Sequence, residues 1–195
     1  MANWCNIRLS VFGTTEDLAP FRKAAGALKG RINTARSSIF TPDMEHGETR
    51  DLEADQVKPF GCRFQRAEYL FQGRNDDHAD HFREVSARYP ALAIVLTFGD
   101  PNSDAHGSYV FLNGRQRTWE VGARLHRQLM MKHYGKWKLL DARGHVDYDS
   151  ESSDWAEWDA FFEMMDIAAV HWDAQVLKWL RQRHPVRRRP RSKLR

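Results

Sequence analysis

The sequence predicts an α+β protein in which two helices interrupt a mostly antiparallel sheet and further helices follow it. Several short runs alternate apolar and polar residues, as strands with one buried face do. Between them, apolar residues recur every three or four positions, as in amphipathic helices. The resulting order is strand, helix, strands, helix, strand, strand. This order is typical of a split βαβ unit, so we expect an α+β core with a helical C-terminal extension.

The first predicted strand and helix occupy the first 30 residues. Apolar and polar residues alternate over 7–11, which predicts a half-buried strand. Apolar residues then recur at helical spacing over 18–28. We expect Asp17 to cap this helix, because Pro20 then falls in the first turn, where its missing N–H costs little. Gly30 is expected to end it.

The segment that follows contains a loop and a strand whose phase changes. Residues 37–40 are predicted as a short strand, and the acidic run 43–55 as an exposed loop. Aromatic residues and a cysteine alternate over 60–64, and apolar residues alternate in the opposite phase over 67–71. A bulge near residues 65–66 would reconcile the two phases.

A second helix and three strands complete the predicted core. Asp76 or Asp77 is expected to cap the helix. The strand over 92–98 is apolar on both faces, which predicts a central strand covered on both sides. Asn113-Gly114 between two alternating runs predicts a β-hairpin over 108–121.

The last third of the chain is predicted to be helical. A helix ends at Gly135, and Asp154 with Glu157 is expected to cap a second one. Apolar residues then continue at spacings of three and four without Gly or Pro until Pro185, which predicts one helix of about 28 residues and ~42 Å. We expect its stripe to be buried on the sheet or in a homodimer. The candidate interface residues are Trp155, Trp158, Phe162, Met165, Trp172 and Val176.

Two stretches resemble a known family. The chain opens with Asn3-Trp4-Cys5, and Tyr89-Pro90-Ala91-Leu92 precedes a strand, His106-Gly107 and Asn113-Gly114. In this order they resemble the YubB ferredoxin-like family of plasmid-, phage- and genomic-island-borne proteins, in patches up to Gly114. That family has no settled activity. The resemblance implies a ferredoxin-like fold and a mobile-element setting, without a site.

The pattern divides the chain into three parts. Residues 1–121 are expected to form the ferredoxin-like core, 122–183 a helical extension packed on the core or on a partner, and 184–195 a disordered basic tail. From Lys178 to the end there are nine Lys or Arg and no acidic residue. Subtracting these nine charges from the net charge of +4 leaves −5 for the rest, so the positive charge is concentrated at one end.

Clustered arginine binds phosphates without reading a base sequence. The C-terminal cluster therefore predicts nucleic-acid binding without strong sequence preference. The helix around His126 adds further cations, which could extend the basic surface. The predicted nucleic-acid-binding residues are Arg181, Arg183, Arg187, Arg188, Arg189, Arg191, Lys193 and Arg195.

No pattern in the sequence predicts catalysis, a cofactor or a metal. His78 and His81 could share a helix face, but the sequence offers no third ligand. Neither Cys5 nor Cys62 has a Cys-x-x-Cys partner, and no acid/base pair or phosphate-binding glycine loop is recognisable. Because no catalytic pattern is recognisable, we expect a protein that is not an enzyme. No apolar run is long enough to cross a bilayer, so we expect a cytoplasmic protein.

Two hypotheses for function remain. In the first, the chain is an accessory protein of a mobile element that binds nucleic acid through its basic end. In the second, it is a phage- or plasmid-borne inhibitor that docks on a host protein complex, such as a defence system, through the aromatic helix or the acidic loop. The sequence does not choose between them.

Overall fold

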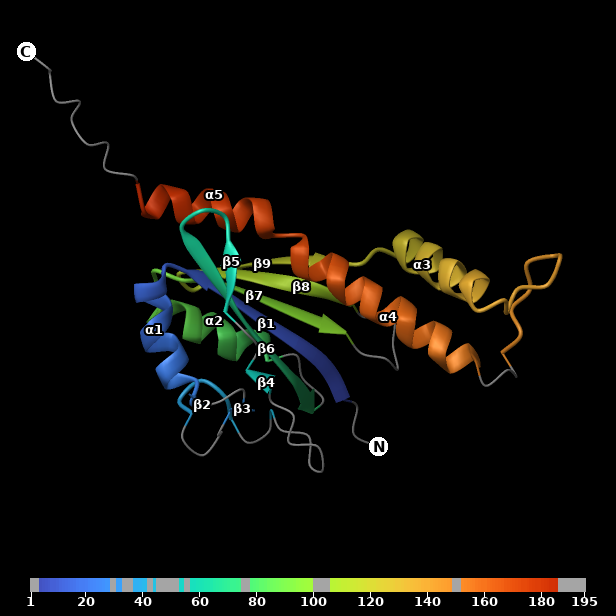
Figure 1. The fold of residues 1–195 in the computed structure, drawn as a ribbon, viewed down its shortest axis with the longest axis horizontal. Coiled ribbons are helices and arrows are strands. Elements are labelled where there is room, and N and C mark those ends of the chain that lie inside the picture. Colours follow the sequence, from blue (N-terminus) through green and yellow to red (C-terminus); the bar gives the residue numbers. More distant parts are fainter. Residues whose placement is uncertain are drawn as a thin grey trace, which may run out of the picture.

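The structure is a computed structural model of an α+β protein with an antiparallel sheet and helices on both of its faces (Figure 1). It describes residues 4–28, 31–32, 37–41, 44, 53–54, 57–74, 78–99, 106–148 and 152–185. Within these ranges, none of the helices combines the length and apolar character needed to span a bilayer.

Until the last third, the described elements follow the predicted order with three unpredicted short strands, of which Ala27–Leu28 replaces the end of the predicted first helix and Glu53–Ala54 lies in the predicted loop 43–55. The strands are β1 (Trp4–Gly13), β2 (Ala27–Leu28), β3 (Arg31–Ile32), β4 (Glu53–Ala54), β5 (Lys58–Phe60), β6 (Phe64–Arg74), β7 (Ala93–Gly99), β8 (His106–Leu112) and β9 (Arg115–Glu120). The helices are α1 (Thr15–Ala24), α2 (Ala79–Arg88), α3 (Ala123–Lys136), α4 (Ser152–Val170) and α5 (Asp173–Arg183).

The sheet places its first strand in the middle. The order is β2-β3-β4-β6-β1-β7-β8-β9, β5 also pairs with β6, and every pairing is antiparallel. Because β1 is antiparallel to both β6 and β7, these two strands run parallel to each other on either side of β1. Helix α2 connects them, so β6, α2 and β7 form a strand–helix–strand unit with β1 inserted.

Helices α1 and α2 cover one face of the sheet, here called the first face. Successive side chains of a strand point to opposite faces, so Leu9 and Ile94 meet Phe21 and Phe82 there. Phe21 and Phe82 have no exposed surface, and the cluster around them is the largest of the described core. Most of the apolar burial in the sheet domain therefore lies on this side.

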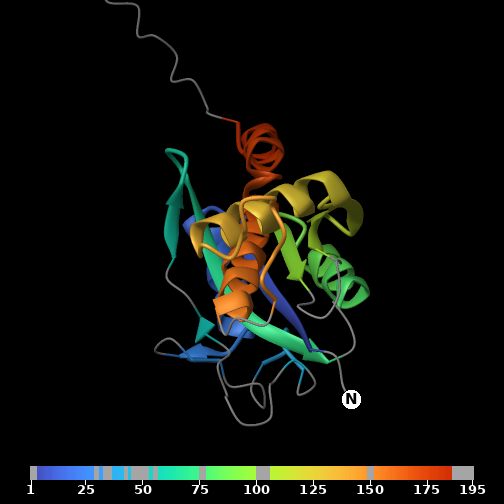
Figure 2. The same cartoon turned by 90° about the vertical axis from the view of Figure 1, so that its right-hand side faces the viewer.

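The second face carries α4 and α5. Helix α4 contacts β7 and β8, and α5 contributes Val176 and Leu180 to a separate apolar cluster with Phe12 and Val95. Seen from the end at which α4 begins, α3 lies beside α4 (Figure 2). The C-terminal helices thus pack on the sheet of their own chain.

The predicted single C-terminal helix is wrong, because the structure has two helices separated at His171–Trp172. Trp172 turns into the second face, where its indole Nε1 donates a 2.9 Å hydrogen bond to the Ser108 hydroxyl. After this break, α5 follows a new direction (Figure 1) that keeps Val176 and Leu180 on the sheet. A straight helix of ~42 Å would extend past so small a sheet.

The phase change after residue 60 also has a different origin from the one predicted. It comes from a hairpin turn over 61–63 between β5 and β6 and not from a bulge, since the β1–β6 register runs without interruption through Gln65 and Arg66. Phe60 and Phe64 are opposite each other across this hairpin and face α5. The turn therefore projects beyond the sheet towards α5.

Several local expectations change at the ends of elements. Thr14, not Asp17, caps α1, because its hydroxyl accepts the Asp17 N–H at 3.2 Å. Helix α4 begins at Ser152, two residues before the predicted cap Asp154. Residues 37–40 form bends and no strand. The proposed caps Asp76 and Asp77, and most of the acidic loop 43–55, lie outside the described residues.

Two expectations about the sheet are confirmed. Asn113 and Gly114 have φ of 53° and 75°, the left-handed pair that a tight two-residue hairpin requires, and they join β8 to β9. Every residue of β7 is buried, as expected for a strand covered on both faces. Both features depend on short stretches of sequence, which explains why they could be predicted.

Candidate functional site

Two of the predicted phosphate-binding residues lie on α5. Arg181 and Arg183 are exposed in the last turn of the helix. The remaining members of the predicted set lie outside the described residues: Arg187, Arg188, Arg189, Arg191, Lys193 and Arg195. The candidate site is therefore built from the described residues around α5.

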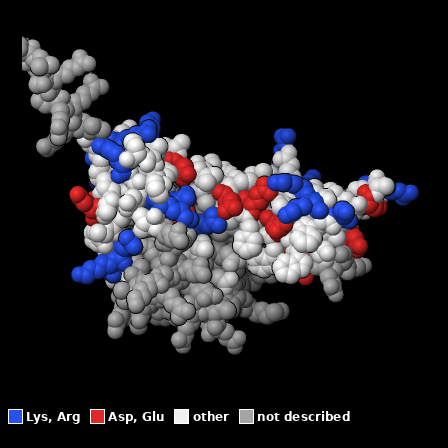
Figure 3. Space-filling view, in the orientation of Figure 1, with Lys and Arg blue, Asp and Glu red and all other residues white. Residues whose placement is uncertain are grey.

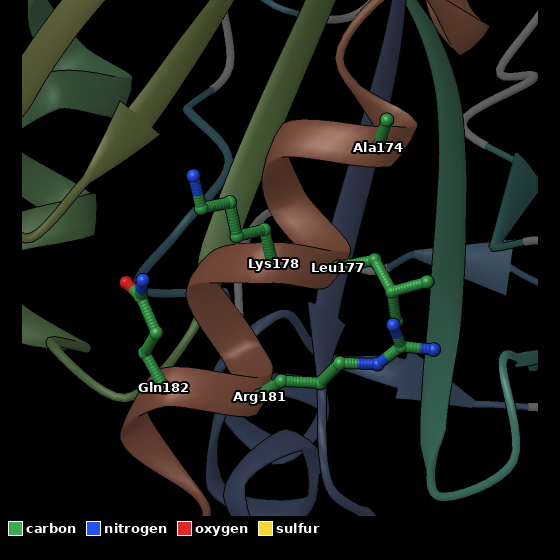
Figure 4. Close-up of a pocket in the computed structure, with 5 residues that line it drawn as sticks. All are labelled: Ala174, Leu177, Lys178, Arg181 and Gln182. Atoms are coloured by element: carbon green, nitrogen blue, oxygen red, sulfur yellow. The ribbon is translucent and has the colours of Figure 1, made fainter.

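The sequence of α5 gives it one buried side and one cationic side. Val176 and Leu180, four residues apart, are fully buried against the sheet. The side chains of Lys178 and Arg181 project from other sides of the helix and are exposed. In Figure 4, Leu177 and Arg181 extend together towards the neighbouring strand, whereas Lys178 points to the other side. The burial of one side of α5 thus fixes its cations in solvent.

A groove separates α5 from the turn between β5 and β6. We call it the hairpin–α5 groove; it encloses about 250 Å³. It continues into a shallow depression of about 430 Å³ along α5, which shares Leu177 and Arg181 with it. The residues lining the groove are Cys62, Arg63, Phe64, Leu177, Arg181 and His184.

Close packing holds the hairpin turn against α5. Gly61 has a φ of 64°, a conformation that favours glycine, and a Cβ atom there would come 3.1 Å from Leu177 Cδ1, so the turn packs closely on α5. On the other side of the turn, the Arg63 guanidinium donates a hydrogen bond to the His184 carbonyl oxygen. These contacts tie the end of α5 to the hairpin and set the shape of the groove.

Several cations around the groove are free to meet an anion. Lys178, Arg181 and Arg183 have no carboxylate partner within the part of the chain that the structure describes. In contrast, Lys58 and Arg66 on the same hairpin both bind Glu68, at 2.7 and 3.0 Å. The positive charge that remains available is therefore on α5 and at the tip of the turn.

Aromatic rings accompany these cations. The Arg63 guanidinium lies 5.5 Å from the centre of the Phe64 ring, and the Arg183 guanidinium 5.2 Å from that of Trp179. The His184 ring is 5.9 Å from Phe64, and its Nε2 is 3.4 Å from an Asp17 carboxylate oxygen. Cations over apolar rings are held in position while keeping their charge accessible.

The basic residues of α3 do not extend this surface. Figure 1 shows α3 and α5 at opposite ends of the second-face layer. Lys132 binds Glu163 and Lys136 binds Asp159, each at 2.6 Å. These lysines hold the pKa values of the Glu163 and Asp159 carboxyl groups below their usual range. Figure 3 accordingly shows blue and red side by side over α3 and α4, and mainly blue over α5.

The aromatic stripe of the C-terminal helices is divided by the break at His171–Trp172. Met165, Trp172 and Val176 are buried on the sheet. Trp155, Trp158 and Phe162 are instead 63%, 41% and 54% exposed, so these three are not buried on the sheet of their own chain, and their burial in a homodimer stays a prediction. Trp158 and Phe162 stack with their ring centroids 5.7 Å apart, and Trp155 lies three residues before Trp158 on the same helix. We call these three residues the α4 aromatic patch.

Sequence reasoning missed the half of the groove that comes from the hairpin. Arg63 is more than a hundred positions from α5 in the sequence and belongs to no continuous run of basic residues. The signal that could have located it is the phase change after Phe60, had it been interpreted as a turn with Gly61 at its start. Lys178 was counted in the basic run, but its freedom from carboxylates depends on the fold.

Comparison with known proteins adds no relative. No family model, no curated protein and no solved structure matches this chain. The candidate site therefore stands on its own chemistry: exposed guanidinium and ammonium groups around an apolar groove.

Proposed function

We propose that this protein binds nucleic acid through α5, the β5–β6 turn and the basic residues that follow α5, and that it is not an enzyme. The observation that carries the proposal is that Lys178, Arg181 and Arg183 are exposed on α5 and have no carboxylate partner among the described residues. A phosphate backbone offers closely spaced negative charges that such a surface neutralises, with release of counterions. The mobile-element role expected from the YubB resemblance is part of the same proposal.

The energetics favour binding without base readout. Each phosphate neutralised lowers the slope of log affinity against log salt by about 0.9 for duplex DNA. The proposed contacts are to phosphates, and contacts to phosphates carry no sequence information directly. We therefore expect weak, salt-sensitive affinity with little dependence on sequence.

The test is the salt dependence of binding to a fluorescent duplex, measured by anisotropy with the full chain. Changing both Lys178 and Arg181 to alanine should flatten the log–log slope by up to about two units. Changing Arg187, Arg188, Arg189 and Arg191 to alanine should flatten it by about three to four units.

A matched control is available on α3. Arg124 and Arg127 are exposed, so replacing both by alanine removes the same charge at the opposite end of the second-face layer. This control should leave the slope unchanged. An equal effect of the control and of the α5 variant would show that only net charge matters, and absence of binding at low salt would end the proposal.

We also propose that the sheet is ferredoxin-like. The supporting observation is that two strand–helix–strand units interleave: β1, α1 and β4 enclose β6, while β6, α2 and β7 enclose β1. The strand order β4-β6-β1-β7 follows from this interleaving. Strands β8 and β9 and the second-face helices are additions to that core.

The alternative function, docking on a host protein complex, is favoured by the α4 aromatic patch. Three large rings exposed together on one helix are unusual in a monomer and are typical of interaction surfaces. Replacing Trp155 and Phe162 by serine should abolish capture of a partner from nuclease-treated lysate while costing little stability. Partners that disappear with nuclease alone would instead favour the nucleic-acid proposal.

A further inference from the structure

We infer that the hairpin–α5 groove receives one nucleotide of a single strand, so that the preferred ligand is single-stranded nucleic acid. This inference rests on the proposed function and adds the class of ligand. It follows from the composition of the groove, which combines an apolar interior with a cationic rim.

The interior of the groove matches a flat apolar ring. Phe64 and Leu177 supply the apolar lining, and the tilted His184 ring adds a third apolar face. The volume of about 250 Å³ is below the roughly 300–1,000 Å³ typical of pockets for drug-sized ligands. A space of this size suits a fragment such as one nucleobase.

The rim matches the phosphate attached to that base. Arg63 stands at the turn and Arg181 on α5, so two guanidinium groups border the same space from different elements. Lys178 continues the positive charge along the adjoining depression of α5. A chain of nucleotides could therefore place one base in the groove and run its backbone along the helix, as single-strand-binding surfaces combine ring contacts with a positive track.

A duplex can contact the cationic rim but cannot easily place a base in the groove. Its phosphates reach the exposed cations, but its bases are paired and stacked, and extruding one costs free energy. The groove should therefore separate single strands from duplexes, whereas Lys178 and Arg183 should serve both. This difference makes the inference separable from the proposed function.

Cys62 provides a way to block the groove in the folded protein. Its thiol is exposed and lines the groove, whereas Cys5 is only partly exposed on β1. Treatment with N-ethylmaleimide should fill the entrance without altering any cation. A Cys62→Ser variant, treated in the same way, reports any effect of modification at Cys5.

The experiment compares anisotropy of a labelled oligothymidylate with that of a duplex of equal length. We expect the single strand to bind about ten-fold tighter, and maleimide to remove this preference in the native chain but not in Cys62→Ser. The single strand should also slow the labelling of Cys62, followed by peptide mass mapping. As a second variant, Arg63→Ala should weaken the single strand more than the duplex.

The outcomes distinguish the two proposals. Equal affinity for both ligands, with a slope that Lys178→Ala and Arg181→Ala flatten, would overturn the single-strand inference and leave nucleic-acid binding standing. A single-strand preference that survives maleimide and leaves Cys62 labelling unchanged would also overturn it, because the base would then lie elsewhere. No binding of either ligand at low salt would overturn both.

Discussion

The two faces of the sheet are built from different chemistry. The first face, under α1 and α2, is an almost wholly apolar cluster. The second face, under α4 and α5, buries Ser10, Glu68, Thr97 and Ser108 besides its apolar residues. The first face is thus held mainly by apolar packing, which has no directional requirement. The second face also contains a directional hydrogen bond, from the Trp172 indole to the Ser108 hydroxyl. The position of α5, and with it the cationic groove, therefore depends on a directed hydrogen bond as well as on the burial of Val176 and Leu180.

The largest expected effect is on the first face. Phe82→Ala removes a ring with no exposed surface and should lower the free energy of unfolding by about 3–5 kcal/mol, measured by urea denaturation. Phe162→Ala is the matched control, because the same atoms leave a side chain that is 54% exposed. It should cost less than about 1 kcal/mol. Similar losses in the two variants would contradict the assignment of the main core to the first face.

A smaller effect is expected on the second face. Trp172→Phe removes the indole donor and leaves the buried Ser108 hydroxyl without it, which should cost about 1–3 kcal/mol. Amide hydrogen exchange should rise in α5 while β1 and β7 stay protected, since α5 depends on this contact for its position. Uniform loss of protection across the sheet would show instead that the two faces unfold as one unit.

The smallest expected effect concerns the hydroxyl group of Tyr69, which is buried in the first-face cluster. Burial raises the pKa of the Tyr69 hydroxyl to about 12, and within the described structure this hydroxyl has no hydrogen-bond partner. Because the folded pKa exceeds the unfolded value, the contribution to stability is complete below pH 10 and is lost as the pH rises towards 12. Between pH 9 and pH 11 the native chain should lose about 1 kcal/mol from this group.

Tyr69→Phe isolates that contribution. The variant lacks the hydroxyl, so its stability should fall less over the same pH interval, and at pH 7 it should be at least as stable as the native chain because no hydrogen bond is broken. Denaturation at both pH values gives the comparison. An identical alkaline loss in both proteins would assign it to other groups.

The sequence predicted most of the first-face architecture because its signals are local. Alternation placed β1, a run apolar on both faces placed β7, and Asn113-Gly114 located the β8–β9 hairpin. The break at His171–Trp172 could not be predicted in the same way, since the spacing of three and four continues across it. At this break Trp172 contacts Ser108, a residue on β8 that no helical periodicity can reveal.

In the candidate site, too, the residues with a local sequence signal were predicted and those that depend on distant contacts were not. Arg181 and Arg183 were predicted from a run of charge, which is visible in one dimension. Arg63 was not, because a single arginine in a turn acquires significance only when β5 and β6 bring it to the end of α5. The sequence also left open whether Trp155 and Trp158 pack on the sheet, since an apolar stripe does not show where the sheet beneath it ends.

Strand β9 has a consequence for the behaviour of the protein in concentrated solution. It forms an outer edge of the sheet, where unpaired backbone groups can template the addition of a strand from another molecule. Arg115 and Arg117 are exposed along this edge. Two copies approaching edge to edge at β9 would bring these like charges together, so β9 resists strand-by-strand aggregation.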